Sequence, residues 1–275
     1  MQVNGQDFSI YYKIPAAQNM VLRIKQFDEF LGRFNYKQDI YGNPISSSFK
    51  EKIGRKEYLY SLFNLEDPRF ITGVTAYNPE YIEKTNRFIT EVTNPENPRF
   101  INPDSELIFA EAKSTFELNG LNTNIDLILK KEFNDHSEKW VIAGIRNDFA
   151  GLSTIPFKDS VISIIPPNSN ETNFMALYRA FEDTKNLSGY FYTGFENDNL
   201  SILSYYSQKN DLKFIGVQEI TYYVLDIPGW VLVVKEFNRD SKNSGWLISD
   251  VIQIDNDIKK YQREYLKIKI IDNNN

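Results

Sequence analysis

The sequence has no cysteine and a single histidine, His136, among its 275 residues. The lack of cysteine excludes disulfide bonds, thiolate nucleophiles and Cys-ligated zinc sites. With one histidine, a zinc site would need mostly carboxylate ligands, and no pattern supports a His-dependent triad. His136 stands in a polar stretch between two apolar runs, which we interpret as a solvated turn. We therefore expect no metal site and no cofactor.

Long apolar runs and an excess of basic residues are also missing. The most hydrophobic stretch, residues 231–234, has the length of a strand, far short of the roughly 18 residues that a membrane helix requires. The net charge is -6, and basic residues are interleaved with acidic ones. Neutralising a phosphate backbone needs clustered Lys and Arg. We expect neither a transmembrane segment nor nucleic-acid binding.

The N-terminal residues carry no secretory signal, because residues 1–6 contain neither a basic region nor an apolar one. Met1 looks like an added start. We therefore expect an extracytoplasmic protein, periplasmic or at the cell surface, whose signal segment is absent from this sequence. A cytoplasmic protein is the alternative.

A short motif that occurs twice organises the chain. Lys-Glu-Phe-Asn stands at residues 131–134 and again at 235–238, and each copy is followed by a tryptophan, Trp140 or Trp246. In both copies an apolar run precedes the motif, a polar turn follows it, and a second apolar run begins at the tryptophan. Each copy predicts a β-hairpin. We expect Glu132 and Glu236 to pair across the strands with lysines.

The first half reads as helices followed by three strands. Apolar residues at steps of three and four predict a helix over 17–34. Ser46 is an expected N-cap, and Pro79 an expected first-turn residue. The further elements are a helix over 46–65, a short strand at 70–74, a helix from 79 to about 92, and strands at 107–118, 124–133 and 140–146. In the strand at 107–118, Glu111 lies on the face expected to be solvated.

The second half repeats this order without a counterpart of the helix at 17–34. The predicted elements are a strand at 161–165, a helix at 173–183, a short strand at 191–195, a helix at 200–208, strands at 212–225, 229–237 and 246–254, a helix or turn after Asp257, and an edge strand at 265–270. We expect an α+β fold with helices packed on antiparallel sheets. The expected domains are residues 1–156 and a shorter copy, residues 157–275.

Helices followed by a long antiparallel meander with a tryptophan at the start of its last strand resemble the NTF2-like (cystatin-like α+β cone) superfamily. Residues 19–34, 106–118, 124–133 and 140–145 carry the resemblance, with second copies of all but the first. The resemblance implies two tandem domains, each with a curved sheet around its helices and an apolar pocket at the open end of the cone. Members of the superfamily include isomerases and dehydratases as well as non-catalytic binding domains, so the fold alone does not select a function.

Two functions follow as hypotheses. The first is a non-catalytic binding or scaffolding protein whose partner is another protein or a small apolar or saccharide ligand. Its expected pocket residues are Tyr60, Phe116, Trp140 and Trp246.

The second hypothesis is an isomerase- or dehydratase-like enzyme with a carboxylate base and tyrosine donors for an oxyanion. In the second half these would be Asp250 with Tyr178 and Tyr222, and in the first half Asp126 with Tyr60. Asp250 replaces Gly144 of the first copy and shares a predicted strand face with Trp246. A paired or edge-exposed aspartate is the commoner outcome for such a position, and no nucleotide-binding, zinc-protease or serine-hydrolase motif is present.

Overall fold

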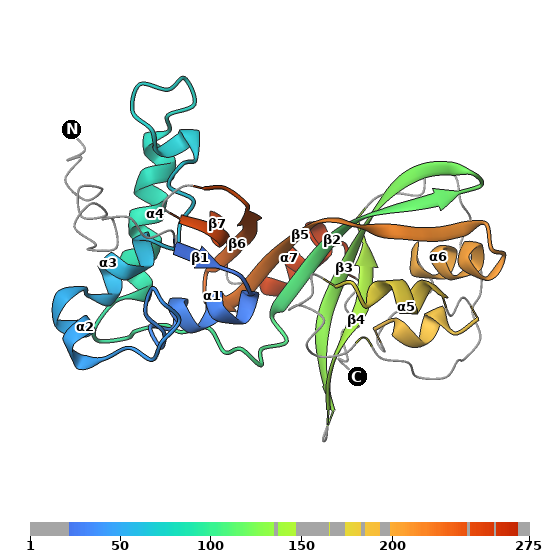
Figure 1. Ribbon diagram of the computed structural model, residues 1–275, viewed down its shortest axis with the longest axis horizontal. Helices are drawn as coiled ribbons and strands as arrows, with labels where there is room; N and C mark the ends of the chain where they lie inside the picture. Colours follow the sequence, from blue (N-terminus) through green and yellow to red (C-terminus); the bar gives the residue numbers. More distant parts are fainter. Residues whose placement is uncertain are drawn as a thin grey trace. The chain divides into compact units, whose positions relative to one another are not determined.

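The computed structural model describes residues 22–134, 137–146, 165, 174–182, 185–192, 199–240, 243–255 and 257–268. The fold is α+β, as the sequence predicts (Figure 1). The chain divides into two compact units. The first comprises Met1–Asp104 and Asp226–Gln253, and the second comprises Ser105–Leu225 and Ile254–Asn275. The division into domains at residue 156 remains a prediction.

The first unit combines helices with a small sheet. Its elements are β1 (Leu22–Ile24), α1 (Phe27–Phe34), α2 (Ser47–Lys52), α3 (Arg55–Tyr60), the 3-10 helix η3 (Pro68–Phe70), α4 (Pro79–Val92), β6 (Trp230–Phe237) and β7 (Asn243–Gln253). Strands β6 and β7 are antiparallel, and β1 runs parallel to β7.

Aromatic side chains form much of the core of the first unit. Phe27 of α1 meets Trp246 edge to face, with ring centroids 6.4 Å apart. Phe88 of α4 meets Trp230 at 5.4 Å in a similar geometry. All four side chains are buried. Edge-to-face pairs of this kind stabilise a core beyond the burial of their area, so these contacts hold α1 and α4 to the hairpin.

The helices of the first unit differ from the predictions at three places. Leu22–Ile24 form β1, so the helix predicted over 17–34 begins only at Phe27, and residues 17–21 lie outside the described part. Ser46 caps α2 as predicted, but Ile53 and Gly54 are extended and divide the predicted helix into α2 and α3. The strand predicted at 70–74 is wrong, because Pro68 opens a 3-10 helix and turns follow it. The helix predicted at Pro79 is confirmed, with Asn78 as its cap.

The second unit is built on a four-stranded antiparallel sheet. Its elements are β2 (Ile108–Leu118), β3 (Leu121–Asn134), β4 (Ser137–Ile145), α5 (Leu177–Glu182), the 3-10 helix η5 (Leu187–Tyr190), α6 (Asn199–Gln208), β5 (Leu212–Ile227, whose last two residues belong to the first unit) and α7 (Ile258–Glu264). The strand order is β5-β2-β3-β4. Two register shifts between β2 and β5 interrupt the ladder, and such bulges bend a sheet. Figure 1 shows the curved strands with α5 and α6 beside them.

The predictions for the two hairpins and for the second half of the sequence have mixed outcomes. The strands of both hairpins and the helix at 200–208 are confirmed. The strand predicted at 265–270 is wrong where it is described, because Tyr265 ends α7 in a helical conformation and Lys267 has a φ of 55°. Residues 161–164 and 193–195 lie outside the described residues, as do 269–270. Ile165 and Phe191 each form an isolated bridge with β4.

Both predicted hairpins share one irregularity. In the first, Ile128 pairs with Gly144 and Leu129 with Ile142, so Ala143 is the extra residue. In the second, Val233 pairs with Asp250 and Val234 with Ile248, so Ser249 is the extra residue. The two bulges stand at the same distance from their tryptophans.

The repeated motif, however, occupies a different register in each hairpin. Lys131, the first residue of the first copy, faces Trp140, whereas Glu236, the second residue of its copy, faces Trp246. A slip of one residue reverses which side chains share a face of the sheet. The two copies of the motif are therefore identical in sequence but not equivalent in structure. The difference changes the surroundings of Glu236 most.

The contact of β1 with β7 depends on Gly245. Its φ is 84°, and a Cβ atom would lie 2.1 Å from the carbonyl oxygen of Ile24. We predict that Gly245→Ala lowers the free energy of unfolding by about 2 kcal/mol or more, from backbone strain and displacement of β1. Gly216→Ala is the control, because a Cβ there meets nothing within 4 Å. Urea denaturation measures both; equal values for the two variants would contradict the prediction.

Candidate functional site

A cleft opens in the first unit where the β6–β7 hairpin meets β1. It has a volume of about 430 Å³, and the residues that line it are Ile24, Lys25, Glu236, Asn238, Arg239, Asp240, Ser244 and Gly245. Most of these side chains are polar or charged. Pockets for apolar ligands are lined mainly by hydrophobic and aromatic side chains, so this cleft suits a polar group.

Arg239 is the fixed cation of the cleft. Its guanidinium donates to the backbone oxygen of Asn243 at 2.9 Å, to the side-chain oxygen of Asn243 at 2.8 Å and to that of Asn64 at 2.7 Å. It also lies 3.3 Å from a carboxylate oxygen of Glu66. The guanidinium of arginine is planar, so hydrogen bonds from several of its N–H groups fix its orientation. Arg239 therefore shapes this end of the cleft.

Glu236 is the cleft's available carboxylate. Its counterpart in the motif, Glu132, faces Lys139 across the strands and pairs with it at 3.0 Å, as predicted. The prediction is wrong for Glu236, because the shifted register places Trp246 opposite it. No ion pair of Glu236 is found among the described residues. Desolvation in the cleft raises the pKa of Glu236 above its ordinary value.

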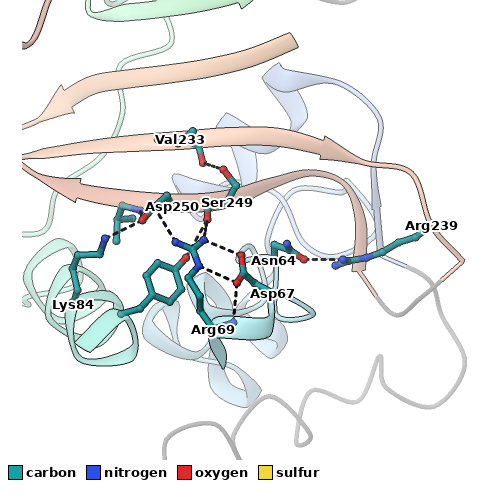
Figure 2. A network of polar contacts seen from close by, with 10 residues as sticks. Asn64, Asp67, Arg69, Lys84, Val233, Arg239, Ser249 and Asp250 are labelled. Atoms are coloured by element: carbon teal, nitrogen blue, oxygen red, sulfur yellow. Dashed lines mark hydrogen bonds and ion pairs between the residues drawn. The ribbon is translucent and has the colours of Figure 1, made fainter. Parts of the chain in front are cut away.

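A second polar cluster of the first unit joins η3 and α4 to β7 (Figure 2). Asp250 lies 3.1 Å from Arg69 and 3.0 Å from Lys84. Arg69 also lies 2.8 Å from Asp67 and donates to the backbone oxygen of Ser249 at 2.7 Å. Burial opposes ionisation of Asp67, but the hydrogen bonds from Arg69 dominate and hold the pKa of that carboxyl below its usual value.

The bulge at Ser249 makes this cluster possible. The bulged residue is left out of the ladder, and its carbonyl oxygen accepts from Arg69 and, at 3.1 Å, from the hydroxyl of Tyr81. The guanidinium of Arg69 also lies over the ring of Tyr81, 3.7 Å from the centroid. Burial is the main reason that the pKa of Tyr81 is raised. The cluster is a set of satisfied groups that fixes the start of α4 to β7.

The second unit contains a buried carboxylate that the sequence reading placed in solvent. Glu111 of β2 is 2% exposed. It accepts from Arg146 at 2.6 Å and from the hydroxyl of Tyr223 at 2.8 Å. Arg146 also donates to the backbone oxygen of Tyr265, and the backbone oxygen of Lys267 lies close to Gly144. The prediction of a solvated face is wrong at Glu111, because the segment after α7 packs over this face of the sheet.

The predicted enzyme residues are distributed over the chain as follows. Asp250 lies in the first unit, and Tyr178 and Tyr222 belong to the second. Tyr178 is 52% exposed, whereas Tyr222 is buried. Of the other predicted pair, Asp126 lies in β3 and Tyr60 in α3. The isomerase-type sets remain predictions.

The predicted pocket residues are buried in the cores. Tyr60 donates to Asn86 at 2.7 Å, and Phe116 packs against Phe181 with centroids 4.9 Å apart. Trp140 packs against Phe174, also at 4.9 Å, and Trp246 against Phe27. Their role in a pocket remains a prediction.

The described residues bring no three His, Cys, Asp or Glu side chains together for a metal ion. His136 lies outside the described residues. Within the described part of the chain, no helix combines the length and apolar character needed to cross a membrane.

Sequence reasoning missed Glu111 and the Arg69 cluster, because both join segments distant in sequence. The second copy of the motif was the one signal of the cleft in the sequence. The sequence does not show that the two copies differ in register, so it does not show that Glu132 and Glu236 face different residues. Comparison with known proteins adds no further assignment: no protein-family model, curated protein or solved structure matches the chain significantly.

The buried carboxylate generates a stability prediction. We predict that Glu111→Ala lowers the free energy of unfolding by about 2 kcal/mol or more, because it leaves Tyr223 and Arg146 without their acceptor. Glu117→Ala on the same strand removes an exposed pair with Lys213, whose side chain is 68% exposed, and we expect a loss below about 0.5 kcal/mol. Urea denaturation at pH 7 compares the two variants; a similar small loss from both would contradict the importance of burial.

The same cluster predicts a loss of stability in alkali. Burial, and secondly the charge of Glu111, raises the pKa of Tyr223 to about 12. The unfolded chain releases the tyrosine proton near pH 10, so the stabilisation is complete below that pH and declines as the pH rises toward 12. Tyr223→Phe removes one titrating group and should flatten the decline between pH 10 and 12. Unfolding free energies measured across this range test it; an unchanged slope would show that Tyr223 does not contribute.

Proposed function

We propose that this chain is a non-catalytic binding or scaffolding protein whose first unit holds a small polar ligand in the cleft at β1, β6 and β7. The observation that carries the proposal is Glu236, a carboxylate that lines the cleft without an ion-pair partner among the described residues and whose pKa is raised. Glu236 is exposed, so a ligand hydroxyl or amino group can reach its carboxylate and donate a hydrogen bond to it.

The lining favours a hydroxyl-rich or amine-bearing ligand, such as a saccharide, over an apolar one. Asn238 contributes an amide, Lys25 an ammonium group, and Ser244 a hydroxyl, beside the fixed guanidinium of Arg239. Such a mixture of donors and acceptors matches hydroxyl and amino groups. No aromatic side chain is among the described residues that line this cleft.

We further propose that the chain consists of two tandem NTF2-like domains that arose by duplication. The shared bulge position in the two hairpins supports the duplication. No specific contact favours the isomerase- or dehydratase-like alternative: Asp250, its expected base, lies between the cations of Arg69 and Lys84.

A ligand screen with a matched variant tests the binding proposal. We expect that glucose, N-acetylglucosamine, maltose or putrescine raises the thermal midpoint of the full chain by about 3 °C at ten times its Kd. The shift should disappear in Glu236→Gln and persist in Glu51→Gln, an exposed glutamate of α2. Acidification should weaken binding at a higher pH than for an ordinary glutamate, because the pKa of Glu236 is raised.

The proposal fails if every shift is the same in Glu236→Gln as in the unchanged chain. It also fails if fatty acids or other apolar probes stabilise the protein while the four polar probes do not.

A further inference from the structure

The segment between η3 and α4 carries no charge, because residues 70–79 include no Asp, Glu, Lys or Arg. Within it, residues 71–77, which we call the apolar loop, are exposed apart from the half-buried Tyr77. Ile71 is 41% exposed and Val74 39%. Single exposed apolar residues are ordinary on protein surfaces, but two in one uncharged loop form a small apolar surface.

The apolar loop has a defined conformation. The amide of Val74 donates to the oxygen of Ile71 at 3.2 Å, and the amide of Tyr77 donates to that of Val74 at 3.0 Å. These bonds define two successive turns. Gly73, at the third position of the first turn, has a φ of 89°, which glycine adopts without strain. The loop is therefore a chain of turns that holds Ile71 and Val74 outward.

The polar cluster of Figure 2 fixes the base of the apolar loop. Asn78 donates its amide to the backbone oxygen of Arg69 at 3.0 Å, which closes the loop. The side chain of Arg69 is held by Asp67, Asp250 and the Ser249 oxygen, as described above. Phe70 packs on Tyr81 with centroids 4.9 Å apart. Both ends of the loop are thus tied to β7 and α4.

We propose that the apolar loop is a docking element for a partner protein, with Ile71 and Val74 entering an apolar pocket on the partner. A surface ordered before binding loses little conformational entropy when it binds. Apolar anchors at the centre of a contact, surrounded by polar residues, are the usual arrangement of binding hot spots. This explains why a network of ion pairs supports a loop that buries little of its own surface.

The charges beside the loop indicate the chemistry of the partner. Glu80 and Glu83, in the first turns of α4, are exposed and form no ion pair within the described part of the chain. A basic rim around the partner's pocket would complement them. Membrane-surface segments instead combine apolar residues with Lys and Arg that attract anionic lipids. Residues 70–79 contain no Lys or Arg, and the flanking Arg69 and Lys84 are paired with Asp67 and Asp250. The expected partner is therefore a protein and not a lipid surface.

Site-specific cross-linking in the full chain tests the proposal. A photo-reactive residue replaces Val74 in one variant and Leu121, which is 75% exposed on the second unit, in the control. In the source cells we expect one discrete protein adduct from position 74 and none from position 121. Both adduct yield and affinity for the purified partner should fall at least tenfold with Ile71→Ser and with the pair Glu80→Lys and Glu83→Lys. Because Ile71 is exposed, Ile71→Ser should leave the thermal midpoint unchanged, whereas the charge reversals should lower it only slightly, since Glu80 interacts favourably with the N-terminus of α4.

Several results would overturn the proposal. These are the absence of an adduct at position 74, an adduct unaffected by Ile71→Ser, an adduct with a second copy of this chain, or co-sedimentation with phosphatidylglycerol vesicles that requires Ile71. The apolar loop shares no residue with the cleft. Loss of ligand shifts in Glu236→Gln therefore bears only on the cleft, and loss of the adduct only on the loop.

Discussion

The register of the β6–β7 hairpin determines the functional surfaces of the first unit. Placing Trp246 opposite Glu236 leaves that carboxylate to the cleft. The bulge in the same hairpin leaves the carbonyl oxygen of Ser249 outside the ladder, where Arg69 and Tyr81 donate to it. One register thus sets up both the proposed ligand site and the anchor of the proposed docking loop. Because side chains alternate along a strand, a shift of one residue would undo both.

The buried ion pairs of this protein contribute more to its stability than the exposed ones. Glu111 is nearly inaccessible, and its hydrogen bonds join β2, β5 and the end of β4. Its loss would leave buried partners unsatisfied. Glu117, on the same strand, has an exposed partner that water can replace. The Arg69 cluster is intermediate, since the side chains of Arg69, Lys84 and Asp250 are about 30% exposed, and its role is to position a loop as much as to stabilise the fold.

The sequence predicted the elements whose signals are local. Pro79 with Asn78 marked the start of α4, Ser46 capped α2, and the two apolar runs around each motif copy became hairpins. The errors arose where a nonlocal contact outweighed the local pattern. Leu22–Ile24 continued a helical spacing but pair with β7, and Glu111 alternated like a solvated residue but is covered by the segment after α7.

The candidate site could be anticipated only in part. Asp250 was expected to be either paired or exposed at an edge, and it is paired, but Arg69 and Lys84 are far from it in sequence and could not be named. The amino-acid sequence by itself determined the α+β class, the two hairpins and the lack of charge in residues 70–79. Tertiary structure alone decided which glutamate lies in the cleft and which is buried. Register, bulges and covering segments come from contacts between distant residues, and no local pattern encodes them.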